Sequence, residues 1–496
     1  MVSLEAIAGC LGVRSTTWEW VTALAVVDFD VDVGHIMRDV CPSPKVLSES
    51  DTATLCFAAM PDSSTGSGLG DDVFAFRLLR SGSSPLWGFS FFRSARDPSC
   101  KRGVSQMAVV LLTPLPLFRL FRLAVTRIAD AYFAQQHAGP GGGAVLREAH
   151  AQLACWATPR ATDPMLSLSA VALPLLGQQL TLQLVRARCG PACAVPCAFL
   201  GPEEVYVAER SNVDALCGLG SLVWTLWQLI LCGESIVVLA PSPEQATELV
   251  LALTSLISPL AFMSDFRPYL SVHAPEWDRY GSFGPPPGSG VILGATNPVL
   301  ARSPPAWQSL LVLAEEPVRP PAPSGAATLR DSLEALTPVF GVSASAEVHG
   351  ERVASWTTQA DCFLRPDERL LRQLGQKSAG DDVQGQLLRE HFEGLTASFL
   401  EPLERFCTMG SLHLRQPIGG STLMLQKWGP QTQARFLKEI ENLEPPPLPR
   451  SLVPQRAHLL KLYAAFLRTP HFTHWWECQR ELTLGGQEPS AESQRR

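Results

Sequence analysis

A run of nineteen uncharged, mostly apolar residues constrains the fold of this chain most strongly. It extends over residues 215–233, between Asp214 and Glu234. This length lies at the lower limit for a membrane-spanning helix, but spanning helices are more often flanked by Lys or Arg than by acidic residues. Residues 235–240 then form a short, Val-rich segment typical of a buried parallel strand. We therefore predict a buried helix followed by a strand, and no transmembrane segment.

The region after this strand alternates between helical and strand-like segments. Ser242 is a suitable N-cap, because Pro243 follows at the first helical position and Gln245 lies three residues on. Two further short apolar strands are expected at residues 291–294 and 310–314. Apolar strands separated by long crossovers are typical of a parallel sheet that helices cover on both faces. We expect residues 161–350 to form an α/β lobe with a mostly parallel sheet.

The first 135 residues show a different pattern, in which strand-like runs follow one another closely. These apolar runs lie at residues 18–29, 73–79, 87–92 and 107–112. Short connections between them favour antiparallel pairing. After Pro114, apolar residues recur at steps of three and four on one helical face: Phe118, Phe121, Val125, Ile128 and Tyr132. We therefore expect residues 1–135 to form an antiparallel sheet backed by a helix.

The C-terminal part has helical periodicity only. Along residues 388–406 the apolar residues step by three and four, and two further helical segments follow. We expect a linker at residues 136–160, an all-helical region at residues 360–484 and a disordered tail at residues 485–496. The predicted fold class is multidomain α/β, with an antiparallel N-terminal lobe, a mostly parallel α/β lobe and C-terminal helices.

Composition excludes several classes of protein. The chain has 40 Lys and Arg against 47 Asp and Glu, a formal net charge of −7, whereas nucleic-acid-binding chains usually carry a basic excess. Hydrophobic residues make up 46% of the chain, which excludes wholesale disorder. The 13 cysteines are an odd number, and no basic region precedes an apolar core at the N-terminus. We therefore expect reduced cysteines in the cytoplasm and no nucleic-acid partner.

Three cysteines lie close together in the sequence, and cysteine is a common metal ligand. Cys189, Cys193 and Cys197 recur at steps of four, which matches no common zinc or iron–sulfur spacing. Pro191 and Pro196 place the segment in a loop. We favour a structural role without metal over a metal or iron–sulfur site.

A second cluster lies near the C-terminus. His471, His474 and Cys478 would lie within reach of one another on a helix, beside Trp475 and Trp476. A zinc site is one interpretation, and packing of an aromatic final helix against its neighbours is the other. The packing interpretation is favoured, because residues of these types are commonly found in cores. We expect neither a metal nor a cofactor in this chain.

The familiar motifs of nucleotide binding and hydrolysis are missing from the sequence. Gly288, Gly290 and Gly294 precede and interrupt a predicted strand, whereas a dinucleotide loop follows a strand and opens a helix. The sequence has no G-x4-G-K-[ST], no G-x-S-x-G and no H-E-x-x-H motif. A hydrolase whose residues assemble only in space stays possible, but no motif indicates covalent chemistry.

Two polar segments are candidates for contact with a partner. The first is a charged segment between two apolar strands and contains Arg93, Arg96, Asp97, Lys101 and Arg102. A solvated hairpin loop and a contact surface are equally consistent with it. The second segment contains Asp265 and Arg267, for which a structural ion pair is favoured over direct contact.

These segments resemble the DENN-domain proteins. The upstream part of these proteins is resembled by FFRSARD at residues 91–97 and KRG at 101–103. The central part is resembled by CGESIVVLAPSP at 232–243, SDFRPY at 264–269 with His273, and VILGATNP at 291–298. The downstream part is carried by EPLERF at 401–406, FLRTP at 466–470 and WW at 475–476. The resemblance extends over about residues 18–480 in unbroken order, and it is greatest to the compact subfamily six.

The resemblance implies a tripartite fold, with a longin-like N-terminal lobe, an α/β lobe and downstream helices. It also implies a guanine nucleotide exchange factor for a Rab-family small GTPase, bound in its GDP or nucleotide-free form, without covalent chemistry. We therefore expect a cytoplasmic protein of endosomal membrane traffic, at recycling endosomes, with at most peripheral membrane contact. The alternative is a non-catalytic adaptor or scaffold that binds a Rab at vesicle membranes.

In this family the cleft between the two lobes holds the GTPase. By motif position, the resemblance implies the contact candidates Arg93, Arg96, Asp97, Lys101 and Arg102 in the first lobe and Asp265, Arg267 and Asn297 in the second. The cysteine cluster, residues 139–143 and residues 322–342 have no counterpart in the family pattern. These departures leave the choice of Rab open.

Overall fold

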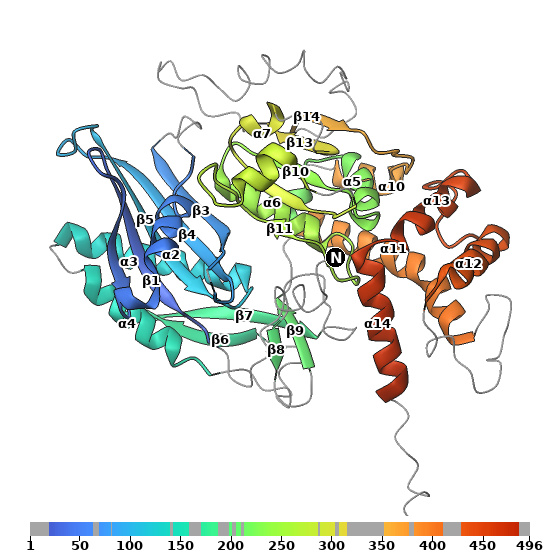
Figure 1. Ribbon diagram of the computed structural model, residues 1–496, viewed down its shortest axis with the longest axis horizontal. Helices are drawn as coiled ribbons and strands as arrows, with labels where there is room; N and C mark the ends of the chain where they lie inside the picture. The colour runs from blue at the N-terminus through green and yellow to red at the C-terminus, as the bar shows by residue number, and fades with distance from the viewer. Residues whose placement is uncertain are drawn as a thin grey trace, which may run out of the picture.

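The chain folds into an N-terminal lobe, a central lobe and a C-terminal group of helices, which follow one another along the longest axis of the molecule (Figure 1). The computed structural model describes residues 19–62, 69–80, 82–138, 142–157, 170–186, 198–200, 205–209, 213–285, 288–302, 307–314, 352–375, 381–409 and 428–485. The cysteine cluster of Cys189, Cys193 and Cys197 and the tail from residue 486 lie outside these described residues.

A five-stranded antiparallel sheet forms the N-terminal lobe, with the order β2-β1-β5-β4-β3. Its strands are β1 (Ala23–Asp30), β2 (Gly34–Cys41), β3 (Gly70–Leu78), β4 (Leu86–Arg96) and β5 (Val104–Thr113). The predicted meander is confirmed for β3, β4 and β5, while β1 pairs with β5 on one side and β2 on the other. β2 was not predicted, because its side chains are mostly half-buried and it has no apolar run.

Three helices pack on this sheet: α2 (Glu49–Ala58), α3 (Phe118–Ala138) and α4 (Gly142–Ala154). The predicted apolar face of α3 covers β3, β4 and β5, and Phe118 contacts the rings of Trp87 and Phe89. Residues predicted as a linker form α4 instead. This helix buries Val145, Leu146, Ala149 and Leu153, a periodicity that the neighbouring glycine run obscured.

The central lobe contains the predicted parallel sheet, with the order β11-β12-β10-β13-β14. The parallel strands are β10 (Ile236–Leu239), β11 (Phe266–Arg267), β12 (Ile292–Ala295) and β13 (Ser309–Leu313), and β14 (Val353–Thr358) adds to the edge in the antiparallel direction. The helices of this lobe are α5 (Leu222–Leu231), α6 (Pro243–Ser255) and α7 (Val299–Arg302). The predicted start of α6 is confirmed, since Ser242 Oγ accepts a hydrogen bond from Gln245 N at 3.2 Å.

The uncharged run forms helix α5, which is buried almost throughout. The two indole nitrogens of this helix donate hydrogen bonds to the C-terminal helices, Trp224 to His391 Nε2 and Trp227 to Thr396 Oγ1. The prediction of a buried helix followed by a strand is therefore confirmed. Within the described part of the chain, no helix is both long and apolar enough to cross a membrane.

A third, antiparallel sheet lies beneath the two lobes in Figure 1 and was not predicted. Its order is β6-β7-β9-β8, and its strands are β6 (Ala170–Leu175), β7 (Gln178–Arg186), β8 (Ala198–Leu200) and β9 (Val205–Glu209). Leu176 and Gly177 form the turn between β6 and β7 with φ values of 47° and 77°. Two residues with positive φ are typical of a tight hairpin turn, although Leu is an unusual residue there.

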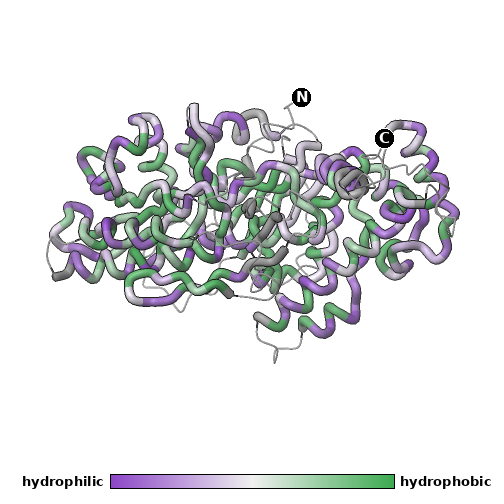
Figure 2. Tube along the Cα trace, turned by 90° about the horizontal axis from the view of Figure 1, so that it is seen from below, coloured by the Kyte–Doolittle hydropathy of each residue, from purple (hydrophilic) through white to green (hydrophobic). Residues whose placement is uncertain are grey.

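The C-terminal region is helical, as predicted. Its helices are α10 (Glu368–Leu374), α11 (Asp381–Met409), α12 (Pro430–Asn442), α13 (Arg456–Phe466) and α14 (Pro470–Gly485). Apolar and polar stretches alternate along these helices, as amphipathic packing requires (Figure 2). Tyr463 of α13 stacks on Phe399 of α11 at 4.2 Å between ring centroids and donates a hydrogen bond to the Phe399 carbonyl.

Candidate functional site

A buried carboxylate joins the N-terminal and central lobes. Asp62, which follows α2, accepts hydrogen bonds from Ser271 Oγ at 2.6 Å and from Val272 N at 3.2 Å. The backbone nitrogen of Asp62 donates to Tyr269 Oη at 2.9 Å. Burial raises the pKa of Asp62, and the hydrogen bonds from Ser271 and Val272 offset part of this increase. This network, which we call the Asp62 joint, fixes the loop after β11 against the N-terminal lobe.

A row of aromatic rings crosses the boundary between the same two lobes at the surface. It consists of Phe29, His35, Phe57 and His273, and we call it the aromatic row. Successive ring centroids lie 5.1, 4.9 and 5.1 Å apart. The first three residues come from β1, β2 and α2, whereas His273 belongs to the central lobe, two residues after the Ser271 of the joint. Phe57 is 39% exposed, so the row presents apolar surface to solvent.

Charged residues of the β4–β5 hairpin border the aromatic row. Because β1 pairs with β5, this hairpin lies beside the turn between β1 and β2. The guanidinium of Arg102 lies 4.8 Å from the centroid of the Phe29 ring, and Lys101 pairs with Asp32 in the neighbouring turn. Val33 of that turn is 75% exposed. The structure thus brings Lys101 and Arg102 to the same surface as the row.

The other predicted residues of this hairpin have different surroundings. Arg96 is exposed at the end of β4. Asp97 closes the hairpin, since its carboxylate accepts hydrogen bonds from Ser99 N and Ser99 Oγ, which lower its pKa. Arg93 donates two hydrogen bonds to Asp71 on β3 and lies 4.4 Å from the centroid of the Phe133 ring. Arg93 therefore links adjacent strands within the lobe.

The predicted residues of the central lobe do not gather beside the first group on an open surface. Arg267 is buried, and it donates to Asp265 Oδ1 at 2.5 Å, as the favoured structural interpretation of this pair predicts. With a side chain only 6% exposed, Arg267 serves this ion pair, and its contact with a partner stays a prediction. Asp265 also accepts a hydrogen bond from Tyr280 Oη, and Asn297 Oδ1 accepts one from Val299 N at the start of α7.

Three residues of the aromatic row were missed from the sequence. Phe29, His35 and Phe57 belong to three different elements, and their rings meet only when β1, β2 and α2 have assembled. No spacing along the chain could have shown this contact. His273 was part of the segment that resembles the DENN family, and its motif was the only available signal.

The C-terminal histidine cluster is part of the core. His471 Nδ1 accepts a hydrogen bond from Met263 N at 2.9 Å, and His474 Nε2 lies 3.3 Å from Cys478 Sγ. The geometry agrees with the packing interpretation, since His471 and Cys478 are buried against α14's neighbours. Among the residues that the structure describes, no group of three or more metal-binding side chains is close enough to hold an ion.

Burial of His471 predicts a loss of stability in mild acid. Burial lowers the pKa of His471 to about 4, below the ordinary value of about 6.5. The unfolded chain therefore binds more protons at His471 between these values, so this residue's contribution to stability falls by about 3 kcal/mol as the pH decreases from about 6.5 to 4. His474, whose pKa burial also lowers to about 4, acts in the same direction. We expect His471→Gln to reduce this slope, as measured by urea unfolding at pH 7.5, 6.5, 5.5 and 4.5. Parallel curves for the two proteins would contradict this assignment.

The surface and the fold around it define a class of protein. The surface combines exposed aromatic rings, a charged border and a rigid buried base, which are features of a protein-binding site. It extends over an antiparallel lobe and a parallel α/β lobe that a helical region follows. This arrangement is that of the tripartite DENN-domain proteins.

Comparison with known proteins agrees with this class. Residues 21–267 match the family described as Transport protein Avl9. Protein DENND6B of Mus musculus is 31% identical over 492 residues, which cover 92% of this chain and 78% of the mouse protein. Protein DENND6B of Homo sapiens is 30% identical over 94% of this chain and 80% of its own length, and Protein DENND6A of Gallus gallus is 28% identical over 94% and 80%. The chain belongs to the DENND6 family, the subfamily six of the DENN-domain proteins.

Proposed function

We propose that this protein is a guanine nucleotide exchange factor for a Rab-family small GTPase. Membership of the DENND6 family supports the partner class. The observation that carries the proposal is the aromatic row, which presents residues of both lobes on one surface above a buried joint. Such a surface suits a partner whose mobile segments must be held in one conformation.

The proposed mechanism requires binding energy and no covalent step. A small GTPase holds its nucleotide through a phosphate-binding loop, Mg²⁺ and two switch segments. If this protein binds the nucleotide-free form more tightly than the loaded form, linkage requires that it weaken nucleotide affinity by the same factor. Exposed apolar rings such as Phe57 would hold the switches open, and Lys101 and Arg102 would orient the GTPase at the border.

The place of action is part of the same proposal. We place the protein in the cytoplasm, with recruitment to endosomes, including recycling endosomes, through its GTPase partner. The described residues contribute no membrane-spanning helix, so this recruitment would be peripheral.

Preference for a nucleotide state separates this proposal from the alternative of an adaptor. An exchange factor favours the GDP-bound or nucleotide-free GTPase, whereas an adaptor that acts downstream favours the GTP-bound form. The test is retention of the purified full-length chain on immobilised Rab proteins prepared without nucleotide, with GDP or with a non-hydrolysable GTP analogue. Retention only on the GTP-analogue form would replace the exchange proposal by the adaptor proposal.

Charge reversal at the hairpin tests its part in this function. We expect Arg96→Glu combined with Lys101→Glu to lower kcat/KM for GDP release about tenfold, mainly through slower association. The fold should remain intact, since exposed ion pairs contribute little to stability. The matched control reverses Arg369 and Lys438, two exposed residues of the C-terminal helices. If GDP release is unchanged in the folded hairpin variant, the hairpin is not a contact surface.

A further inference from the structure

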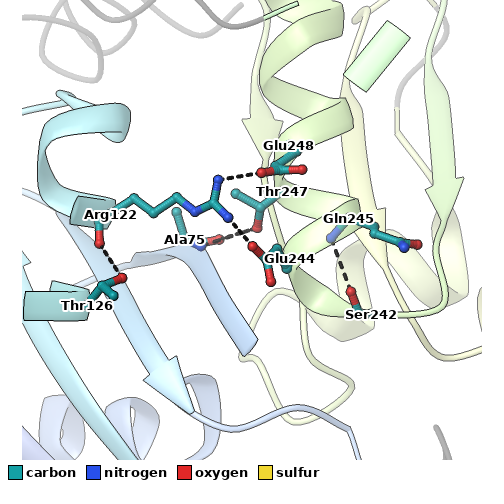
Figure 3. A network of polar contacts seen from close by, with 8 residues as sticks. All are labelled: Ala75, Arg122, Thr126, Ser242, Glu244, Gln245, Thr247 and Glu248. Carbon is teal, nitrogen blue, oxygen red and sulfur yellow. Dashed lines mark hydrogen bonds and ion pairs between the residues drawn. The ribbon is translucent and has the colours of Figure 1, made fainter. Parts of the chain in front are cut away.

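One arginine and two glutamates form a further connection between the lobes. Arg122 of α3 donates to Glu248 Oε1 at 2.5 Å and pairs with Glu244, both on one face of α6 (Figure 3). On the same turn of α6, Thr247 Oγ1 accepts a hydrogen bond from Ala75 N of the edge strand β3 at 3.2 Å. We call Arg122, Glu244 and Glu248 the arginine clamp. It connects residues more than a hundred positions apart in the sequence.

Arg122 offsets the repulsion between the two glutamates. Glu244 and Glu248 lie four residues apart on a helix, where two carboxylates repel each other. Burial raises the pKa of Glu244, Arg122 lowers it, and the neighbouring Glu248 raises it again. Without Arg122, this face of α6 would present two uncompensated negative charges to the N-terminal lobe.

The clamp lies at the edge of an opening between the lobes. Arg122 and Glu248 line a cavity of about 760 Å³ whose walls come from both lobes, with Phe74 and Phe118 on one side and Leu251 on the other. Beyond the cavity the lobes pack through aromatic rings, as where Trp87 of β4 stacks on Phe266 at 5.4 Å between ring centroids. At the cavity itself, the polar contacts between the lobes are the clamp and the Ala75–Thr247 hydrogen bonds.

The two connections differ in their surroundings. Asp62 is buried within its hydrogen-bond network, whereas the side chain of Arg122 is 41% exposed. Half-exposed ion pairs contribute little to global stability and respond to salt. The Asp62 joint and the ion pair of the buried Arg77 with Asp265 are thus fixed connections, and the clamp is a connection that can be opened without unfolding the chain.

We propose that Arg122 is a positioning residue, which sets the spacing of the two lobes and so the alignment of the surface that both lobes share. The functional consequence of this inference rests on the proposed exchange function. The aromatic row, which would contact the GTPase, is continuous only when Phe57 and His273 keep their places. The positioning itself is a property of the protein alone and is measurable without a GTPase.

The first test is amide hydrogen exchange of the free protein. We expect Arg122→Glu to accelerate exchange at least tenfold in peptides that contain Ala75 and residues 244–250, while peptides from α12 and α13 exchange as in the wild type. Combining Arg122→Glu with Glu244→Arg and Glu248→Arg should restore slow amide exchange, because it swaps the charges of α3 and α6 and so re-forms the ion pairs. Unchanged exchange in Arg122→Glu, with the protein folded, would overturn the inference.

The second test is GDP release from the GTPase identified for the wild type. We expect Arg122→Glu to lower kcat about tenfold with little change in KM, Arg122→Lys to have an intermediate effect, and the charge-exchanged variant to recover. If Arg122→Glu accelerates GDP release as well as the wild type does, although its amide hydrogens exchange faster, then lobe spacing does not matter for function. That result would overturn the functional consequence of the inference. If the wild-type protein does not accelerate GDP release from any GTPase, the proposed function fails. The amide-exchange result still decides whether Arg122 positions the lobes.

Discussion

Replacing Asp265 by alanine is expected to lower the free energy of unfolding by about 3–5 kcal/mol, because it removes the shared carboxylate of two buried arginines. The side chains of Arg267 and Arg77 are only 6% and 4% exposed, and their guanidinium groups lie 2.5 and 3.5 Å from Asp265 Oδ1. The other carboxylate oxygen accepts a hydrogen bond from Tyr280 Oη at 2.7 Å. Urea unfolding of the variant and the wild type at pH 7 measures the loss.

Two further variants make this prediction specific. Asp265→Asn keeps the shape of the side chain and removes only its charge, so we expect an intermediate loss of stability. Asp278→Ala removes an exposed carboxylate thirteen residues away in the sequence and should change stability by less than about 0.5 kcal/mol. A loss of less than 1 kcal/mol in Asp265→Ala would show that the other contacts of Arg77 and Arg267, such as that of Arg267 with Glu276, are sufficient, and would contradict a structural role for Asp265.

Replacing Phe57 by alanine is expected to lower kcat/KM for GDP release about 30-fold, which corresponds to the roughly 2 kcal/mol typical of an aromatic residue at the centre of an interface. Phe57 lies between His35 of its own lobe and His273 of the central lobe, so its removal interrupts the aromatic row. Stability should change little, since the ring is partly exposed in the free protein. Stopped-flow measurement of GDP release at several concentrations of the variant gives the change.

Two control variants test whether the loss of GDP release is specific to the position and the ring of Phe57. Val383 is an exposed apolar residue on α11 and does not belong to the aromatic row, so Val383→Ala should leave GDP release unchanged. Phe57→Leu keeps apolar area without an aromatic ring and should recover part of the activity. Wild-type rates in a folded Phe57→Ala variant would remove the aromatic row from the candidate site.

The elements that could be predicted from the sequence are those whose pattern is local. Ser242, Pro243 and Gln245 specify the start of α6 within four residues, and the uncharged run specifies a buried helix by its composition and its flanking acidic residues. Strand β2 and the sheet of β6 to β9 could not be predicted in this way. Their strands are half-buried or interrupted by polar residues, and they are stabilised by pairing with strands elsewhere in the chain.

The candidate site was predicted less completely than the fold, for the same reason. Motif position identified Arg96, Lys101 and Arg102, which are exposed on the hairpin, but it could not show that Arg267 would be buried. Burial depends on the elements that pack around a residue. The arginine clamp was also missed, because Arg122 and Glu248 are 126 positions apart and neither belongs to a recognisable motif.

Release of a fluorescent GDP analogue from a panel of purified Rab GTPases tests the central claim most directly. The full-length chain is added at increasing concentration to each loaded Rab, and the rate of fluorescence loss is followed with excess unlabelled nucleotide. The exchange proposal predicts acceleration that rises with concentration for one or a few Rab proteins and is reduced in Phe57→Ala. Spontaneous rates across the whole panel, with the chain shown to be folded, would contradict it.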